Sequence, residues 1–349
     1  MITKELYRDR LRAAFLSRAA GCTLGAPVEG WTTGQMEDYA AKLGISFPCT
    51  DYWPDITNPD EPRYIYQKFR DYTRPYLNGI PCDDDINFTL LSLFIAEEGH
   101  GRDFTLEDVK NAWLKYITMA FTAEDVALSN LRNGISAEHA AEIDNPFQEF
   151  IGADIRCDGY GYMAPGDPAK AADMAETDAR ISHRNNGIYG SRFFAAAISL
   201  AFELGDVKKA LEAALDYIPA ECELADGVRW AIGIWDGVGD YVNAAKLVDE
   251  KYPGMHPVHT INNACLTIFG LALGGRDIGK VISNCVARAH DCDCTAATAG
   301  SIAGAAYGMD ALDKKWYDAF GDTVFSFYNG PKSYSINDIL SRYEKMSGI

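Results

Sequence analysis

Two short acidic clusters are the residues of this sequence best suited to chemistry: Asp83-Asp84-Asp85, and Asp291 with Asp293. Each cluster opens a stretch with the composition of a buried helix. Either one alone would fit a group of solvated acids at a helix N-terminus, where the helix dipole favours negative charge. Several carboxylates that converge on one place, however, need a counter-charge, and hard oxygen ligands suit Mg²⁺ or Mn²⁺. The pair of clusters therefore predicts a centre for two divalent cations, roughly 3.5–4 Å apart.

Cysteine usage bears on both the metal and the compartment. Cys292 and Cys294 raise zinc or copper as an alternative, but an isolated CxC pair is weak support for either, and thiolate is a poor ligand for Mg²⁺. The nine cysteines form no CxxC pairs, and the N-terminal residues interleave charge with apolar side chains. We therefore expect a cytoplasmic protein with reduced thiols.

Overall composition limits the partners. No apolar run approaches the roughly 20 residues that a membrane helix needs, so we expect no membrane segment. The formal net charge of −18 would repel phosphate backbones, so we expect no nucleic acid partner. A small anionic substrate stays possible if a cation or a helix N-terminus receives it. The sequence does not indicate an oligomeric state.

The run that follows the second cluster is rich in alanine and glycine. Gly300, Gly304 and Gly308 recur every four residues and so fall on one face of a helix. An interior glycine costs a helix roughly 1 kcal/mol, which suggests a packing reason for three in register. We expect this helix in the middle of a bundle, with its N-terminal acids held against Asp83-Asp84-Asp85.

Helical spacing dominates the rest of the chain, whereas strand alternation is scarce. We predict an all-α fold: a single compact, orthogonal multi-helix bundle over residues 1–349. Capping-box patterns begin at Thr105 and Thr122. The other predicted helices span residues 4–21, 86–98, 168–181, 190–204, 206–219, 238–251, 262–272 and 278–289. Two long segments, 31–81 and 144–167, are expected to be ordered loops that face a substrate.

Three segments resemble the signature motifs of the ADP-ribosylglycohydrolase family. They are DDDINFTL at 83–90, DCDCTAATAGSIAG at 291–304 and GCTLGAPVE at 21–29. The resemblance extends from about residue 10 to residue 310 in the family's order. It implies an all-helical fold, two Mg²⁺ or Mn²⁺ ions, and hydrolysis of the bond at C1″ of ADP-ribose attached to a protein side chain or a small acceptor.

The resemblance also implies roles for single residues. Asp84, Asp85, Asp291 and Asp293 would be metal ligands. Asp83 stands where the family usually has a hydroxyl residue and could keep a ligand. Cys294 stands where the family often has threonine and offers a poorer ligand for a hard cation.

Two of the acids are candidates for proton transfer. Glu29 matches a family glutamate near the substrate ribose, and either Glu29 or Asp84 would serve as general base. His183 matches a family histidine that lines the ligand cleft, although a single histidine is often only a buried polar residue.

The segment 155–165 departs from the family's glycine-rich diphosphate loop. Arg156 and Asp158 stand where glycines are expected, and Tyr162 replaces an arginine. Asp158, with Tyr160 and Tyr162 as possible stacking partners for a base, is predicted to contact substrate, and burial of the tyrosines in the core is the equal alternative. The departure favours a smaller ligand or a different leaving group. The alternatives to ADP-ribosyl hydrolysis are therefore hydrolysis of nucleosides or other small ribosyl N-glycosides, and ADP-ribose binding without catalysis.

Overall fold

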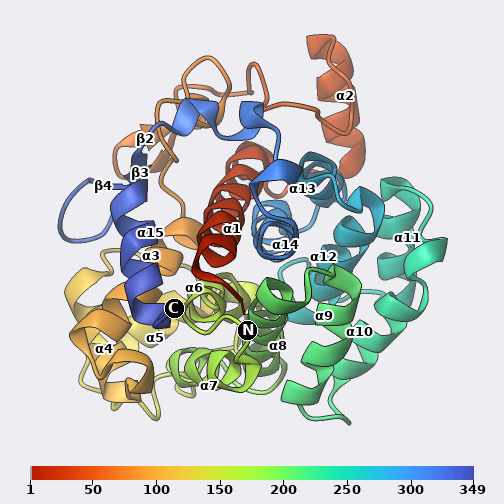
Figure 1. The fold of residues 1–349 in the computed structure, drawn as a ribbon. Helices are drawn as coiled ribbons and strands as arrows, with labels where there is room; N and C mark the ends of the chain where they lie inside the picture. The colour runs from red at the N-terminus through yellow and green to blue at the C-terminus, as the bar shows by residue number, and fades with distance from the viewer. Residues whose placement is uncertain (1) are drawn as a thin grey trace.

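The structure is a computed structural model that describes residues 2–349, and helices form nearly all of its regular structure (Figure 1). In chain order the α-helices are α1 (Lys4–Gly25), α2 (Thr33–Leu43), α3 (Asp84–Glu98), α4 (Leu106–Tyr116), α5 (Thr122–Arg132), α6 (Asp158–Met163), α7 (Pro168–Ala179), α8 (Asn186–Leu204), α9 (Val207–Ala214), α10 (Glu223–Gly233), α11 (Tyr241–Lys251), α12 (Thr260–Gly274), α13 (Ile278–Ala287), α14 (Cys292–Tyr307) and α15 (Ile336–Ser347). Two antiparallel strand pairs join β1 (Pro62–Tyr64) to β2 (Gln67–Lys68) and β3 (Thr323–Phe325) to β4 (Ser333–Ser335). The predicted all-α fold is confirmed.

Helices α1 and α14 lie side by side at the centre of the molecule, α1 in red and α14 in blue in Figure 1. α14 also packs against α13, α12 and α8, and every residue from Cys292 to Ala306 is buried. A helix enclosed on all sides has little room for large side chains, which accounts for its alanine and glycine content.

Glycine lets the two central helices touch along their backbones. A Cβ atom on Gly300 would lie 2.5 Å from the carbonyl oxygen of Ser17, and one on Gly304 would lie 2.5 Å from the Cα of Ala14. The predicted close packing of this face is confirmed at both positions. Gly308 differs from the expectation, because it ends α14 with a φ of 74° instead of extending the packed face.

The other predicted helices are present within a few residues of their expected bounds. Of the two predicted capping boxes, one is formed. Thr105 caps α4, and Asp108 completes the predicted capping box. The second predicted box is wrong: α5 already includes Thr122, and the residue before it, Phe121, makes no side-chain cap bond.

The two segments expected to be loops contain helices. The first holds α2, which begins with a capping box of Thr32 and Gln35, a pattern visible in the sequence, and the β1–β2 hairpin. The second holds a 3₁₀ helix (Ile151–Arg156) followed by α6. Residues 156–163 are buried in the core, so this part of the segment does not form the expected loop.

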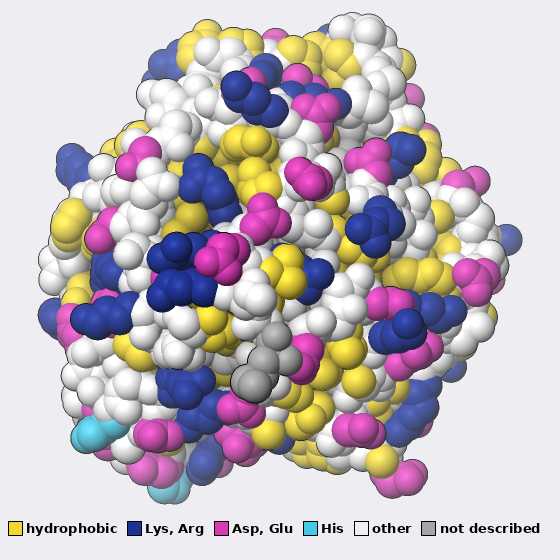
Figure 2. Space-filling view, in the orientation of Figure 1, with side chains coloured by type: hydrophobic (Ala, Val, Ile, Leu, Met, Phe, Trp, Pro, Cys, Tyr) yellow, Lys and Arg dark blue, Asp and Glu magenta, His cyan; other side chains and the backbone are white. Residues whose placement is uncertain are grey.

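No helix in the described part of the chain is long and apolar enough to cross a membrane. On the face drawn in Figure 2, acidic and basic side chains are interspersed instead of gathered into one patch of a single sign. The concentration of charge that matters for chemistry is internal.

Candidate metal and active site

Three elements bring six carboxyl groups to one place. Glu29 follows the 3₁₀ turn that continues α1, the triplet Asp83–Asp85 opens α3, and Asp291 and Asp293 open α14. The backbone contact between α1 and α14 reaches this end of the helices, since a Cβ on Gly25 would lie 2.5 Å from the Cα of Asp293. Glycine therefore fixes how near the end of α1 comes to the acids of α14.

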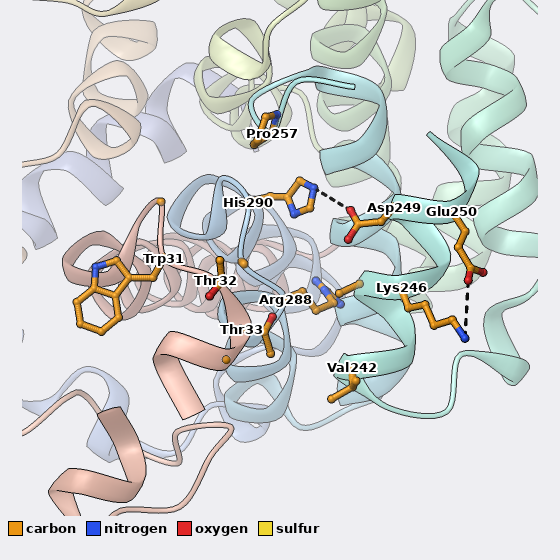
Figure 3. A pocket seen from close by; sticks show the side chains of 14 residues that line it. Trp31, Thr32, Thr33, Val242, Lys246, Asp249, Glu250, Pro257, Arg288 and His290 are labelled. Atoms are coloured by element: carbon orange, nitrogen blue, oxygen red, sulfur yellow. Dashed lines mark ion pairs between the residues drawn. The ribbon is translucent and has the colours of Figure 1, made fainter. Parts of the chain in front are cut away.

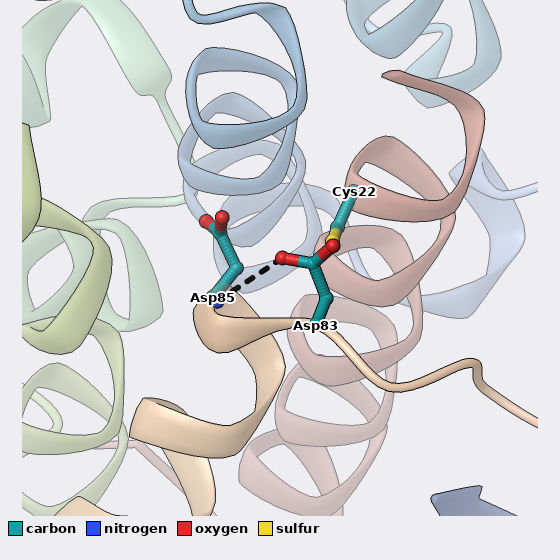
Figure 4. Close-up of side chains that lie close together, drawn as sticks. All are labelled: Cys22, Asp83 and Asp85. Atoms are coloured by element: carbon teal, nitrogen blue, oxygen red, sulfur yellow. Dashed lines mark hydrogen bonds between the residues drawn. The ribbon is translucent and has the colours of Figure 1, made fainter. Parts of the chain in front are cut away.

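The start of α3 supplies the first of two groups of candidate ligands. Asp83 is the N-cap, and its carboxylate accepts a hydrogen bond from the backbone N–H of Asp85 at 3.2 Å (Figure 4). Figure 4 shows the Asp83 carboxylate turned toward Cys22 of α1, while the Asp85 carboxylate points elsewhere. Ligand atoms of these three buried residues lie within 4.8 Å of one another.

The start of α14 supplies the second group, whose ligand atoms also lie within 4.8 Å of one another: Asp291, Asp293 and Cys294. The Cys294 thiol donates to Asp85 Oδ2 at 3.3 Å, which joins the two groups. Burial and the nearby carboxylates raise the pKa of Cys294 well above that of an ordinary thiol. Without a metal, this side chain is therefore a thiol that donates its proton to Asp85. The expectation that both acidic clusters meet is confirmed.

Arg63 lies between the two groups, and the sequence analysis did not single it out. Its Nη2 donates to Glu29 Oε2 at 3.0 Å, to Asp83 Oδ2 at 3.1 Å and to Asp293 Oδ2 at 3.1 Å. The side chain comes from strand β1 and is 10% exposed. One guanidinium thus neutralises acids from all three elements of the centre.

Arg18 is the second buried arginine of the centre and holds Asp85 in place. Its Nη2 lies 3.3 Å from Asp85 Oδ1, and its Nη1 lies 2.9 Å from Asp158 Oδ1. The same Nη2 donates to the backbone oxygens of Asp85 at 2.9 Å and Ile155 at 2.5 Å. A single arginine within the largely apolar run 13–20 was the available sequence signal.

Four acids of the centre, Asp84, Asp85, Asp291 and Asp293, have a pKa above that of an ordinary carboxyl group. Burial is the main cause, and the neighbouring carboxylates add to it: the pKa of Asp84, Asp85 and Asp293 is raised well above the usual range, and that of Asp291 to about 6. Tyr64 donates from its hydroxyl to Asp84 Oδ1 at 2.7 Å. Asp291 Oδ1 is buried and has no hydrogen-bond partner among residues 2–349.

The charges and hydrogen bonds of the centre indicate whether these residues suit a divalent cation. Crowded, desolvated carboxyl groups and an unpartnered buried oxygen are what a hard cation would relieve, and carboxylate oxygens are the donors that Mg²⁺ and Mn²⁺ prefer. The unpartnered oxygen of Asp291 fits such an ion. The side of Asp83 and Asp293 already carries the Arg63 guanidinium.

The centre opens into a cavity of about 390 Å³. Its polar floor is made by Glu29, Arg63 and the acids Asp84, Asp291 and Asp293. Its apolar wall consists of Phe69, Phe121, Ile151, Ile155 and Val258. A polar floor under an apolar wall suits an organic ligand with a hydroxylated end.

A second, larger cavity of about 700 Å³ is lined by residues 30–34, which follow Glu29 in the sequence, and by residues 288–290, which precede Asp291 (Figure 3). His290 lines it and lies 3.4 Å from Asp249 of α11. In the described part of the chain, the acids of the centre line the smaller cavity and not this one.

Comparison with known proteins agrees with these motifs. The sequence model of the ADP-ribosylglycohydrolase family matches residues 3–343. The chain belongs to this family. A solved structure described as "ADP-ribosylglycohydrolase-related protein complex" covers 99% of this chain and 99% of its own, with a TM-score of 0.63 and 19% sequence identity, and shares the fold. No curated protein matches the chain.

In this family member the four residues predicted to contact substrate lie in the core and do not line the cavity: Asp158, Tyr160, Tyr162 and His183 are each 0% exposed. Asp158 is bound to Arg18, and the Tyr162 hydroxyl bonds to Ser301. His183 shares a hydrogen bond of 2.8 Å with Ser182, and burial lowers its pKa well below the usual value. Asp158 alone reaches the centre, through Arg18.

Proposed function

We propose that this chain is a divalent-metal-dependent hydrolase of the bond between C1″ of ADP-ribose and an acceptor. The observation that carries the proposal is the convergence of six carboxyl groups, from Glu29, α3 and α14, on the floor of one cavity. Membership of the ADP-ribosylglycohydrolase family supports a glycosidic bond as the target.

The residues that would hold the cation are acids of both helices. Asp84, Asp85 and Asp291 have oxygens that Arg63 does not contact through a hydrogen bond, and Asp83 and Asp293 stand beside them. Mg²⁺ or Mn²⁺ bound there would supply positive charge and orient the hydroxyl groups of a ribose. Arg18 and Asp158 would position Asp85 and not touch the substrate.

Glu29 is our choice of general base. Its side chain is 45% exposed, whereas Asp83 and Asp293 beside it are buried, and it borders the cavity. A carboxylate there can accept a proton from water as that water attacks C1″, while the bond from C1″ to the acceptor breaks and the acceptor takes up a proton from solvent. Asp84 is the second choice, because its hydrogen bond from Tyr64 occupies one of its oxygens.

A smaller ribosyl compound, such as a nucleoside, is the second candidate substrate. Residues 156–163 are buried, and Arg156 is tied to Glu124 at 2.8 Å and to Asp178 at 2.9 Å. This segment therefore offers no flexible glycine-rich backbone to a diphosphate, which favours a substrate with less phosphate.

The test is hydrolysis by the purified protein with and without Mg²⁺ or Mn²⁺. The panel contains ADP-ribosyl-arginine, ADP-ribosyl-serine, O-acetyl-ADP-ribose and free nucleosides, and release of the ribosyl product is measured. Metal-dependent release from an ADP-ribosyl compound, abolished in Asp291→Asn and retained in the exposed control Asp236→Asn, supports the proposal. Release from nucleosides alone supports the second candidate. Binding of ADP-ribose without release from any compound indicates a non-catalytic binding protein.

A further inference from the structure

The Arg63 guanidinium occupies a position between the two groups of candidate ligands. Its Nη2 lies within 3.1 Å of one acid from each group, Asp83 on α3 and Asp293 on α14, and 3.0 Å from Glu29. A cation that bridges acids of both helices is the role that a metal ion has in a centre with two ions.

The surroundings of Arg63 hold the guanidinium in place. The rings of Tyr64, Phe69 and Tyr72 lie 5.4–5.7 Å from its central carbon, within the range of cation–π attraction. The next residue, Tyr64, donates to Asp84, which fastens the same strand to α3. Arg63 is therefore a built part of the centre and not a surface side chain that happens to reach it.

The acids divide into two sets according to this contact. Glu29, Asp83 and Asp293 bond to Arg63, whereas Asp84, Asp85 and Asp291 do not. The second set includes the buried Asp291 oxygen that has no partner among the described residues. A divalent ion on the first set would have to displace the guanidinium or lie against it, and like charges in a desolvated centre repel strongly.

We propose that Arg63 takes the place of one of the two cations, so that the centre binds a single divalent ion, beside the unpartnered oxygen of Asp291. This inference rests on the proposed metal dependence and goes beyond it, because it fixes the number of ions and their side of the centre. Arg63 acts as a positioning residue that keeps Asp83, Asp293 and Glu29 together without a metal.

The test counts bound Mn²⁺ by calorimetric titration and by electron paramagnetic resonance, in the full-length protein stripped of metal. We expect one ion per chain in the wild type, with an uncoupled Mn²⁺ spectrum, and two ions with a spin-coupled spectrum in Arg63→Met. Arg70→Met is the matched control, because Arg70 follows on the same segment but pairs with the exposed Asp60, and it should bind one ion. Asp291→Asn should bind none.

The outcomes separate this inference from the proposed function. Two ions in the wild type, or equal counts in the wild type and Arg63→Met, overturn the role of Arg63 and leave metal-dependent hydrolysis intact. No Mn²⁺ in either protein overturns the metal dependence itself. The wild-type count decides the matter even if Arg63→Met does not fold, and Arg63→Lys, which keeps the charge, should then retain one ion.

Discussion

Two buried groups of charges in this molecule differ in their balance. Around Arg156, the guanidinium contacts Glu124 at 2.8 Å, Asp178 at 2.9 Å and the Ser182 hydroxyl at 2.9 Å, and its charge is shared by two acids. In the candidate metal and active site, six acids lie around Arg63 and Arg18, and Arg18 also pairs with Asp158.

The two groups differ in how far their buried negative charge is compensated. The Arg156 group has one guanidinium for two acids, and although Asp178 Oδ1 has no hydrogen-bond partner among the described residues, its excess of negative charge is small, which suits a structural role. The candidate metal and active site has a larger excess of negative charge, an unpartnered oxygen on Asp291, and acids whose pKa is raised by burial and by the neighbouring carboxylates. An excess of buried negative charge lowers stability unless positive charge compensates it. Arg63 supplies part of that positive charge.

The largest expected effects come from removing one arginine of each group. Arg18→Met and Arg156→Met should each lower the free energy of unfolding by about 3–5 kcal/mol, because each leaves buried acids without their partner. Added Mn²⁺ should restore part of the stability of Arg18→Met, whose acids include Asp85, and none of that of Arg156→Met. Urea unfolding with and without Mn²⁺ measures both, and equal rescue of the two variants would contradict the distinction.

The next effect separates catalysis from stability. Glu29→Gln should lower turnover about 10²-fold or more, because a general base is lost, with little change in the unfolding temperature. Glu124→Gln should do the reverse, since that acid, which also lines the cavity, is buried and paired with Arg156. Steady-state kinetics and thermal unfolding of both variants provide the check. Unchanged turnover in Glu29→Gln would transfer the role of base to Asp84.

A smaller effect tests the backbone contact that brings the acids together. In Gly25→Ala the new methyl group would meet the Cα of Asp293, and overpacking of this kind costs about 1–3 kcal/mol. Mn²⁺ affinity should fall as well, because α14 must shift. Gly34→Ala on α2, where no atom lies within 4 Å of the added Cβ, is the control and should be neutral or slightly stabilising. Equal stabilities of the two variants would refute the close contact.

The smallest effect concerns pH in the absence of metal. The pKa of Asp291 is about 6 in the folded protein and 3.8 otherwise, so between these values the folded state binds more protons than the unfolded chain. The Asp291 carboxyl therefore contributes to the free energy of unfolding at low pH, and this contribution is lost as the pH rises toward 6 and above. The gain in stability on Asp291→Asn should grow by about 1 kcal/mol from pH 5 to pH 7. Both proteins contain His183, whose lowered pKa changes stability with pH in the opposite direction, so its contribution cancels in the difference. A constant difference would contradict the shift.

Part of this architecture could be predicted from the sequence. Helical spacing, the alanine- and glycine-rich run and the two acidic clusters are local patterns, and each led to a feature that the structure contains. Arg63 could not be found this way, because its partners Asp83 and Asp293 are 20 and 230 residues away and the chain around it has no regular pattern. Whether Asp158 and Tyr162 contact a ligand or the core could not be decided from the sequence, because sequence position alone does not reveal that α6 turns into the core.

The glycine contacts between α1 and α14 also affect how this protein can evolve. Where two main chains touch, the spacing between their functional groups is set by atomic radii, which no change of rotamer can adjust. Substitution around the cavity wall can alter the substrate while the distance from Glu29 to the acids of α14 stays the same. A map of tolerated mutations should therefore show a ladder of forbidden positions, Gly21 and Gly25 on one helix and Gly300 and Gly304 on the other, beside a freely varying cavity rim.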